Sequence, residues 1–113
     1  MASREAVMET LRAQNARFAH EKAAASFKGW TRLMRYDFPD IGLSATIDVK
    51  DGVPAEPVEG GAGTAQVSYE MTSDTFLAIA RKELTGMQAY TRKLVRVKAS
   101  MGDLLKLQKL DAL

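Results

Sequence analysis

The sequence predicts an α+β fold, and three observations support that prediction. Apolar residues recur at helical spacing within residues 1–29. Between residues 30 and 71 the apolar period changes to two, and turn signals separate the alternating segments. Residues 73–113 return to helical spacing, with one strand-like segment between two helices. This order of helices, strand meander, helix, strand and helix is typical of α+β proteins rather than of alternating βαβ units.

Two helical segments are expected at the start of the chain. In the first, Ser3 is a suitable N-cap, and the apolar residues of one face are Val7, Met8, Leu11 and Phe18. The second segment is rich in alanine, runs from Glu21 to Lys28 and is expected to stop at Gly29.

Alternation predicts the strands that follow. A first strand over residues 30–38 turns four side chains to one face: Trp30, Met34, Tyr36 and Phe38. After a turn, residues 43–50 alternate in the same way, and Asp51-Gly52 is a hairpin signal. Residues 53–58 contain Pro54 and Pro57, so this strand should be short or lie at an edge. Beyond a glycine-rich loop at residues 59–63, a further strand has an inner face of Ala65, Val67, Tyr69 and Met71.

The last third of the chain is expected to form helix, strand and helix. Ser73 can cap a helix that Gly86 ends, a short turn covers residues 87–92, and a final strand covers residues 94–99. The closing helix starts near Met101 or Gly102, and its leucines spread around most of its circumference. Such a helix is either buried on several sides or covers apolar material that is not part of the chain.

Composition limits the classes of function. The 113 residues fit one domain, and 46% apolar with 27% charged residues is an ordinary soluble mixture. Cysteine is absent, which excludes disulfides and thiolate metal sites. No apolar run suits a membrane span or a secretory signal, so we expect a cytoplasmic protein.

Charge is distributed unevenly along the chain. The net charge is +2, yet residues 92–113 carry six bases and two acids. A basic surface of this kind could make transient contact with an anionic membrane, although solvated charged faces are the commoner situation.

Candidate catalytic and metal-binding groups are few. His20 is the only histidine, and its charged surroundings favour a solvated side chain. The acids of residues 48–59 lack the spacing of a calcium loop, and the glycines of residues 60–63 lack the Lys-Ser/Thr of a phosphate loop. Aromatic residues are not interleaved with the basic segment, as a nucleic-acid surface would require. We therefore expect no enzyme, no cofactor, no metal and no nucleic-acid partner.

Apolar residues offer the remaining possibility. Six methionines are present, and several stand on or beside predicted inner faces: Met34, Met71, Met87 and Met101. Methionine suits adaptable apolar binding surfaces, but an inward methionine is more often plain core. Periodicity alone favours a filled core over a pocket.

Residues 67–79 and 93–110 resemble the sterol carrier protein two family. The motifs Asp74-Thr75-Phe76, Met101-Gly102 and Lys106-Leu107-Gln108-Lys109-Leu110 match it in order and spacing, and the hairpin of residues 47–52 also fits. The resemblance implies a five-stranded, mostly antiparallel sheet covered by about five helices, with a hydrophobic tunnel that accepts sterols, fatty acids or acyl-CoA esters. It implies no catalytic residues and no cofactor.

The sequence departs from the family at three places. Lys82, Lys93 and Ala99 stand where the family usually has glycine, which bears on the turns around the cavity mouth. The Ser-Lys-Leu tail of the family's peroxisomal members is also missing. We therefore expect a stand-alone, prokaryotic-type domain over residues 1–113, helical to residue 29, a strand meander over residues 30–71 and helix-strand-helix over residues 73–113.

The favoured hypothesis is non-catalytic binding or transfer of a lipid. The residues expected to line its pocket are Trp30, Met34, Tyr36, Phe38, Ile47, Phe76, Leu77, Met87, Met101, Leu104 and Leu105. The alternative is an interaction module with a filled cavity, which forms a homodimer through its last helix or docks on a lipid-metabolising enzyme.

Overall fold

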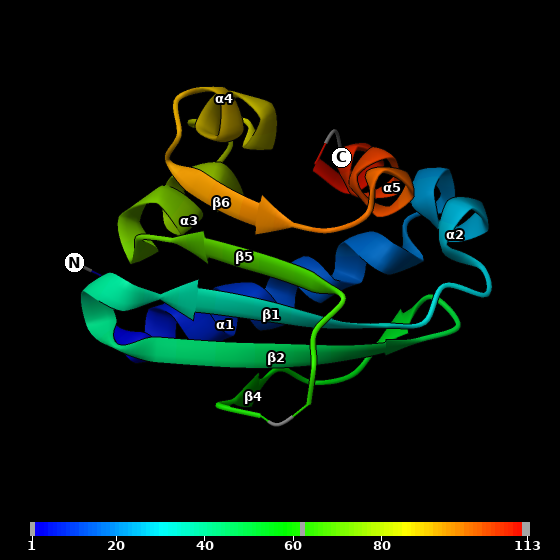
Figure 1. Ribbon diagram of the computed structural model, residues 1–113, viewed down its shortest axis with the longest axis horizontal. Helices are drawn as coiled ribbons and strands as arrows, with labels where there is room; N and C mark the ends of the chain where they lie inside the picture. The colour runs from blue at the N-terminus through cyan, green and yellow to red at the C-terminus, as the bar shows by residue number, and fades with distance from the viewer. Residues whose placement is uncertain (1, 62, 112–113) are drawn as a thin grey trace.

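A mixed β-sheet occupies the centre of the computed structural model, which describes residues 2–61 and 63–111 (Figure 1). The strands lie in the order β3-β2-β1-β5-β6, and β4 also pairs with β2. The strands are β1 (Arg32–Phe38), β2 (Leu43–Lys50), β3 (Val53–Pro54), β4 (Val58–Glu59), β5 (Val67–Met71) and β6 (Val95–Lys98). Only β1 and β5 run parallel among these pairs, so the sheet is mostly antiparallel, as predicted.

The described strands number six rather than the expected five, because the proline-containing segment is divided. Its two ends form β3 and β4, each two residues long, and both pair with β2. Pro54 and Pro57 have no N–H to donate, so a continuous strand cannot form there. Between the two short strands, the Ala55 N–H still donates to the Asp48 carbonyl at 2.8 Å.

Five α-helices surround the sheet within the described residues, in agreement with the prediction. They are α1 (Arg4–Gln14), α2 (Glu21–Phe27), α3 (Ser73–Ala80), α4 (Gly86–Thr91) and α5 (Met101–Asp111). Two 3₁₀ turns, η1 (Asn15–Ala19) and η2 (Pro39–Ile41), join elements. In Figure 1, α1 passes behind β1 and β2, whereas α4 and α5 lie together beside β6. Ser3 caps α1 as expected, because its hydroxyl accepts from the Ala6 N–H at 3.1 Å.

The region between α3 and β6 corrects two expectations. Thr72, not Ser73, is the N-cap of α3, and its hydroxyl accepts from the Thr75 N–H. Gly86 does not end α3 but begins α4, so residues 87–92 are largely helical rather than a turn. The physical reason is a capping box: Thr85 and Gln88 each accept from the other's backbone N–H at 3.0 Å.

The core lies on the face of the sheet that the alternation predicted. Every predicted inward residue of β1 and β2 is buried: Met34, Tyr36, Phe38, Leu43, Ala45, Ile47 and Val49. On the opposite face, the segment between β4 and β5 passes so close to β2 that a Cβ on Gly61 would meet Thr46. Thr46 is therefore buried although it faces away from the core. Among the described residues, no helix is long and apolar enough to cross a bilayer.

Candidate functional site

A cavity of about 280 Å³ lies between the inner face of the sheet and the helices. The strands contribute Met34, Tyr36, Tyr69, Met71, Val95 and Val97. The helices contribute Gln14, Arg17, Phe76, Ile79, Gly86, Met87, Tyr90, Met101, Leu104, Leu105, Leu107, Gln108 and Leu110. Its size is near the lower end of the roughly 300–1,000 Å³ that small-molecule pockets occupy.

The lining is apolar with a few polar groups. Arg17 of η1 is the one charged side chain among the described lining residues, and Gln14 and Gln108 add amides. The Arg17 Nε–H donates to the Gln14 carbonyl at 3.1 Å. Gln14, Arg17 and Ile79 also border a second hollow, which lies along α1 and α3. Two of the three polar lining residues, Gln14 and Arg17, therefore come from α1 and η1, and the third, Gln108, comes from α5.

Seven of the eleven residues predicted to line a pocket border this cavity: Met34, Tyr36, Phe76, Met87, Met101, Leu104 and Leu105. The other four do not: Trp30, Phe38, Ile47 and Leu77. Phe38 has no exposed surface and packs against Phe76, with ring centroids 5.2 Å apart. Ile47 lies on β2, and the strands that border the cavity are β1, β5 and β6. Whether the seven bind a ligand stays a prediction.

Sequence reasoning missed several lining residues. Tyr69 and Met71 were assigned to an inner face but not to the pocket, and the alternation of β6 could have indicated Val95 and Val97. Arg17 and Gln108 gave no signal, because a polar side chain on an amphipathic helical segment is expected to face water.

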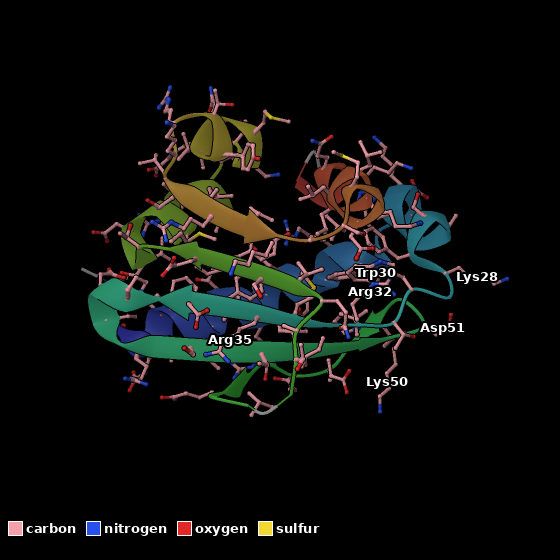
Figure 2. The ribbon with its side chains drawn as sticks, in the orientation of Figure 1. Lys28, Trp30, Arg32, Arg35, Lys50 and Asp51 are labelled. Atoms are coloured by element: carbon pink, nitrogen blue, oxygen red, sulfur yellow. The ribbon has the colours of Figure 1, made fainter. Side chains whose placement is uncertain are left out.

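Trp30 belongs to a buried polar contact beside the cavity. Its indole N–H donates to the Asp103 carboxylate at 2.8 Å, and the Arg32 Nε–H donates to the other oxygen at 3.0 Å. The Arg32 guanidinium also lies 5.5 Å from the centre of the Trp30 ring. Figure 2 shows Trp30 and Arg32 close together beneath α5. Burial raises the pKa of Asp103, but the hydrogen bonds from Trp30 and Arg32 outweigh it and hold that pKa below its usual range.

These contacts, with others from the same helix, fix α5 as one wall of the cavity. The Lys106 ammonium donates to the Ser26 carbonyl at 2.6 Å, which ties the middle of α5 to α2. All four leucines in the described part of α5 line the cavity: Leu104, Leu105, Leu107 and Leu110. Their wide spread around the helix agrees with their different burial: Leu107 and Leu110 are buried, whereas Leu105 is 56% exposed.

The described residues that line the cavity include no histidine, aspartate or glutamate. His20 is exposed and caps α2, its Nδ1 accepting from the Lys22 N–H at 3.1 Å. Within residues 2–61 and 63–111, no three His, Cys, Asp or Glu side chains are grouped so that they could hold a metal ion.

Comparison with known proteins identifies the family. The model of the SCP-2 sterol transfer family matches residues 9–112, nearly the whole chain. The chain belongs to this family. No curated protein sequence matches it.

Solved structures agree with that assignment at the level of the fold. The crystal structure of sterol carrier protein 2 like 2 from Aedes aegypti is 17% identical, with a TM-score of 0.69, and the match covers 94% of this chain and 96% of that one. The palmitated form of that mosquito protein, solved in solution, is 16% identical, with a TM-score of 0.69, and the match covers 97% of this chain and 95% of that one.

The same fold also forms part of an enzyme. A sec-alkylsulfatase from Pseudomonas is 20% identical, with a TM-score of 0.62, over 79% of this chain. The match covers only 14% of the sulfatase chain.

Lys82 and Lys93, at two positions where the resemblance implies glycine, have a backbone conformation that favours glycine. Lys82 and Lys93 have φ angles of 65° and 61°, in the left-handed region. Each follows a helix, α3 or α4, in a Schellman motif: Glu83 N–H donates to the Ala78 carbonyl, and Leu94 N–H to the Ala89 carbonyl. The turns beside the cavity mouth therefore form despite the substitutions.

Proposed function

We propose that this SCP-2 family chain binds and carries one lipid-like molecule in the cavity and does not convert it chemically. The observation that supports the proposal is a cavity of about 280 Å³ whose walls are almost entirely apolar and aromatic. Burial of apolar ligand surface there would contribute about 25 cal/mol per Å². The cytoplasmic location expected from the sequence is part of the proposal.

A fatty-acid-like ligand fits the cavity better than a sterol. The cavity volume, at the low end of the range for small-molecule pockets, favours a single slender chain. Arg17 is the one charge among the described lining residues, and a guanidinium favours a carboxylate. The mosquito relative solved in its palmitated form supports the same ligand class. Sterols and acyl-CoA esters are the other candidates.

Ligand binding to a cavity-filling variant tests the proposal. We expect the lipid-free chain to bind a fluorescent fatty acid that palmitate displaces better than cholesterol does. Leu104→Trp, which adds bulk at a lining position, should weaken binding at least about ten-fold because overpacked sites resist extra volume. Val53→Trp is the matched control, since Val53 is 67% exposed and remote from the cavity lining. Equal binding by both variants, or none by the unchanged chain, would contradict the proposal.

One observation favours a second function, that of an interaction module. Met101 and Leu105 of α5 are 72% and 56% exposed, and the related fold occurs within a much longer sulfatase chain. The chain could then form a homodimer through α5 or dock on a lipid-metabolising enzyme. Native mass spectrometry separates the two functions, because a carrier shows a monomer with a lipid-sized adduct and an interaction module shows a lipid-free dimer.

A further inference from the structure

Exposed apolar side chains gather where the cavity meets the surface. Five of them belong to α4, the residue before β6 and α5, with exposed fractions between 43% and 72%; they are Met87, Tyr90, Leu94, Met101 and Leu105, here called the mouth patch. All but Leu94 also line the cavity. The only other exposed large apolar residues of the described chain are Val53 and Val58. The rim of the cavity is thus unusually apolar, which is typical of an interaction site.

The mouth patch lies on one side of the molecule. Figure 1 shows α4 above the start of β6 and α5 beyond the end of that strand, and the two helices contact each other. β6 is the last strand in the sheet order, so no further strand covers this side. A flat partner could therefore reach α4, Leu94 and α5 together.

The surroundings of the mouth patch are basic. Residues 81–109 contain eight bases (Arg81, Lys82, Arg92, Lys93, Arg96, Lys98, Lys106 and Lys109) and two acids (Glu83 and Asp103), although Arg96 is paired with Glu70 of β5. Asp103 is buried and paired with Arg32, so it adds little negative charge to the surface. Arg92 and Lys93, between Tyr90 and Leu94 in the chain, are exposed, and no ion pair joins either of them to another described residue.

The opposite side of the molecule provides a contrast. There the bases of α1 are matched by acids, since Arg4 pairs with Glu59 and Arg12 pairs with Glu56. Among the described residues, Arg92 and Lys93 thus stand beside exposed apolar side chains without an ion pair, whereas Arg4 and Arg12 of α1 are each paired with an acid.

We infer that the mouth patch docks on an anionic lipid bilayer. Met87, Tyr90, Leu94, Met101 and Leu105 would enter the interfacial region, while Arg92 and Lys93 would meet the headgroups. Tyrosine is suited to this depth because its ring is apolar and its hydroxyl is polar. The inference extends the proposed function, since the cavity would open directly onto the bilayer and an apolar ligand could pass without crossing water.

Vesicle binding by the full chain, measured without added ligand, tests the inference. We expect sedimentation with vesicles of phosphatidylcholine and phosphatidylserine, much less with phosphatidylcholine alone, and release at high salt because the charges are screened. Arg92→Glu should weaken binding at least about five-fold, the effect of one base near an anionic surface. Leu94→Glu should weaken it at least as much, because it replaces an apolar side chain of the mouth patch by a negative charge. Val53→Glu, at an exposed apolar residue on the hairpin of β2 and β3, should bind like the unchanged chain.

The two proposals can fail separately. Neither Arg92 nor Leu94 lines the cavity, so both variants should still bind the fluorescent fatty acid in solution. Loss of fatty-acid binding with intact vesicle binding would overturn only the proposed ligand. Absence of vesicle binding, equal binding to both vesicle types, or equal loss in Val53→Glu and Leu94→Glu would overturn the docking inference. A dimer that leaves both vesicle types unbound would overturn it as well.

Discussion

Asp103 illustrates how one buried carboxylate can hold a wall of the cavity in place. It lies in the first turn of α5, yet its two oxygens accept hydrogen bonds from Trp30 and Arg32, about seventy residues earlier in the chain. Hydrogen bonds to a charged acceptor contribute more than neutral ones, typically about 1.5–3 kcal/mol. This contact therefore fixes the start of α5 against the beginning of β1.

Replacement of Asp103 by asparagine should destabilise the fold. Asparagine is neutral, and its NH₂ group cannot accept a hydrogen bond from Trp30 or Arg32. One of these two donors therefore loses its hydrogen-bond acceptor. We expect the free energy of unfolding, measured with urea, to fall by about 2 kcal/mol. Asp48→Asn is the control, because Asp48 is half-exposed and its change should stay within about 0.5 kcal/mol. Equal effects of the two substitutions would show that the Asp103 contact is not a stabilising one.

Two carboxylates should make stability depend on acid pH. Burial raises the pKa of Asp40 and of Asp103, but hydrogen bonds outweigh it: from Ser73 to Asp40, and from Trp30 and Arg32 to Asp103. Both pKa values therefore lie below the ordinary 3.8. A carboxyl group whose pKa is lower in the folded state than in the unfolded state stabilises the fold at pH values above its unfolded-state pKa. That stabilisation is lost as the pH falls through the folded-state pKa.

We accordingly expect the free energy of unfolding to decline as the pH falls below about 5. The decline should be shallower in Asp103→Asn, which lacks one of the two groups. Urea unfolding at a series of pH values measures both slopes. Parallel slopes in the two proteins would mean that Asp103 does not contribute to the acid sensitivity.

At the scale of elements, the ends of α3 and α4 are the most informative features. Each helix ends with a lysine in the left-handed conformation, Lys82 or Lys93, where glycine would fit without strain. The hydrogen bonds of the Schellman motif and the packing of the following segment hold the lysine there.

Lys93→Gly should therefore stabilise the protein. Relief of the left-handed strain amounts to about 1 kcal/mol, part of which the greater freedom of glycine in the unfolded chain offsets. We expect the free energy of unfolding to rise by about 0.5 kcal/mol. The matched control is Lys98→Gly in β6, which should destabilise by about 0.5–1 kcal/mol because glycine weakens a strand. A loss of stability in Lys93→Gly would show that the lysine side chain itself supports the turn.

Sequence reasoning predicted the strands better than the helices of the second half. Period-two alternation identified both β1 and β2 with their inward faces, because one side of each is buried. Helix α4 was not predicted, because Gly86 resembles the glycine that follows the end of a helix. The Thr85 and Gln88 pair of the capping box was nevertheless present in the sequence. A glycine can begin a helix as well as follow one, so composition alone could not decide.

The cavity lining was predictable only in part, for a geometric reason. Alternation tells which face of β1 a residue occupies but not how far along the strand the cavity extends. Met34 and Tyr36 therefore border it, while Phe38, on the same face, is covered by Phe76. Arg17 was beyond prediction because its place at the cavity depends on the 3₁₀ turn that follows α1.

For the whole molecule, an unfilled cavity would lower stability. A wholly empty space of about 280 Å³ in a close-packed interior would forgo up to about 7 kcal/mol of packing, at about 24 cal/mol per Å³. That is comparable with the 5–15 kcal/mol that separates folded from unfolded domains. A bound lipid would restore many of the missing contacts, which agrees with the proposed carrier function.

The parallel pairing of β1 with β5 has a consequence for how the chain acquires its cavity. Met34 stands beside Val67, whereas the hairpin of β1 and β2 joins residues much closer in the chain, with Phe38 beside Leu43. Local pairs close quickly, and distant ones must first overcome the entropy of a long loop. During synthesis, β1 and β2 can pair while β5, β6 and α5 are still unmade. The nascent chain can therefore have a paired hairpin with an exposed inner face before any cavity exists, because β5, β6 and α5 supply most of the remaining wall.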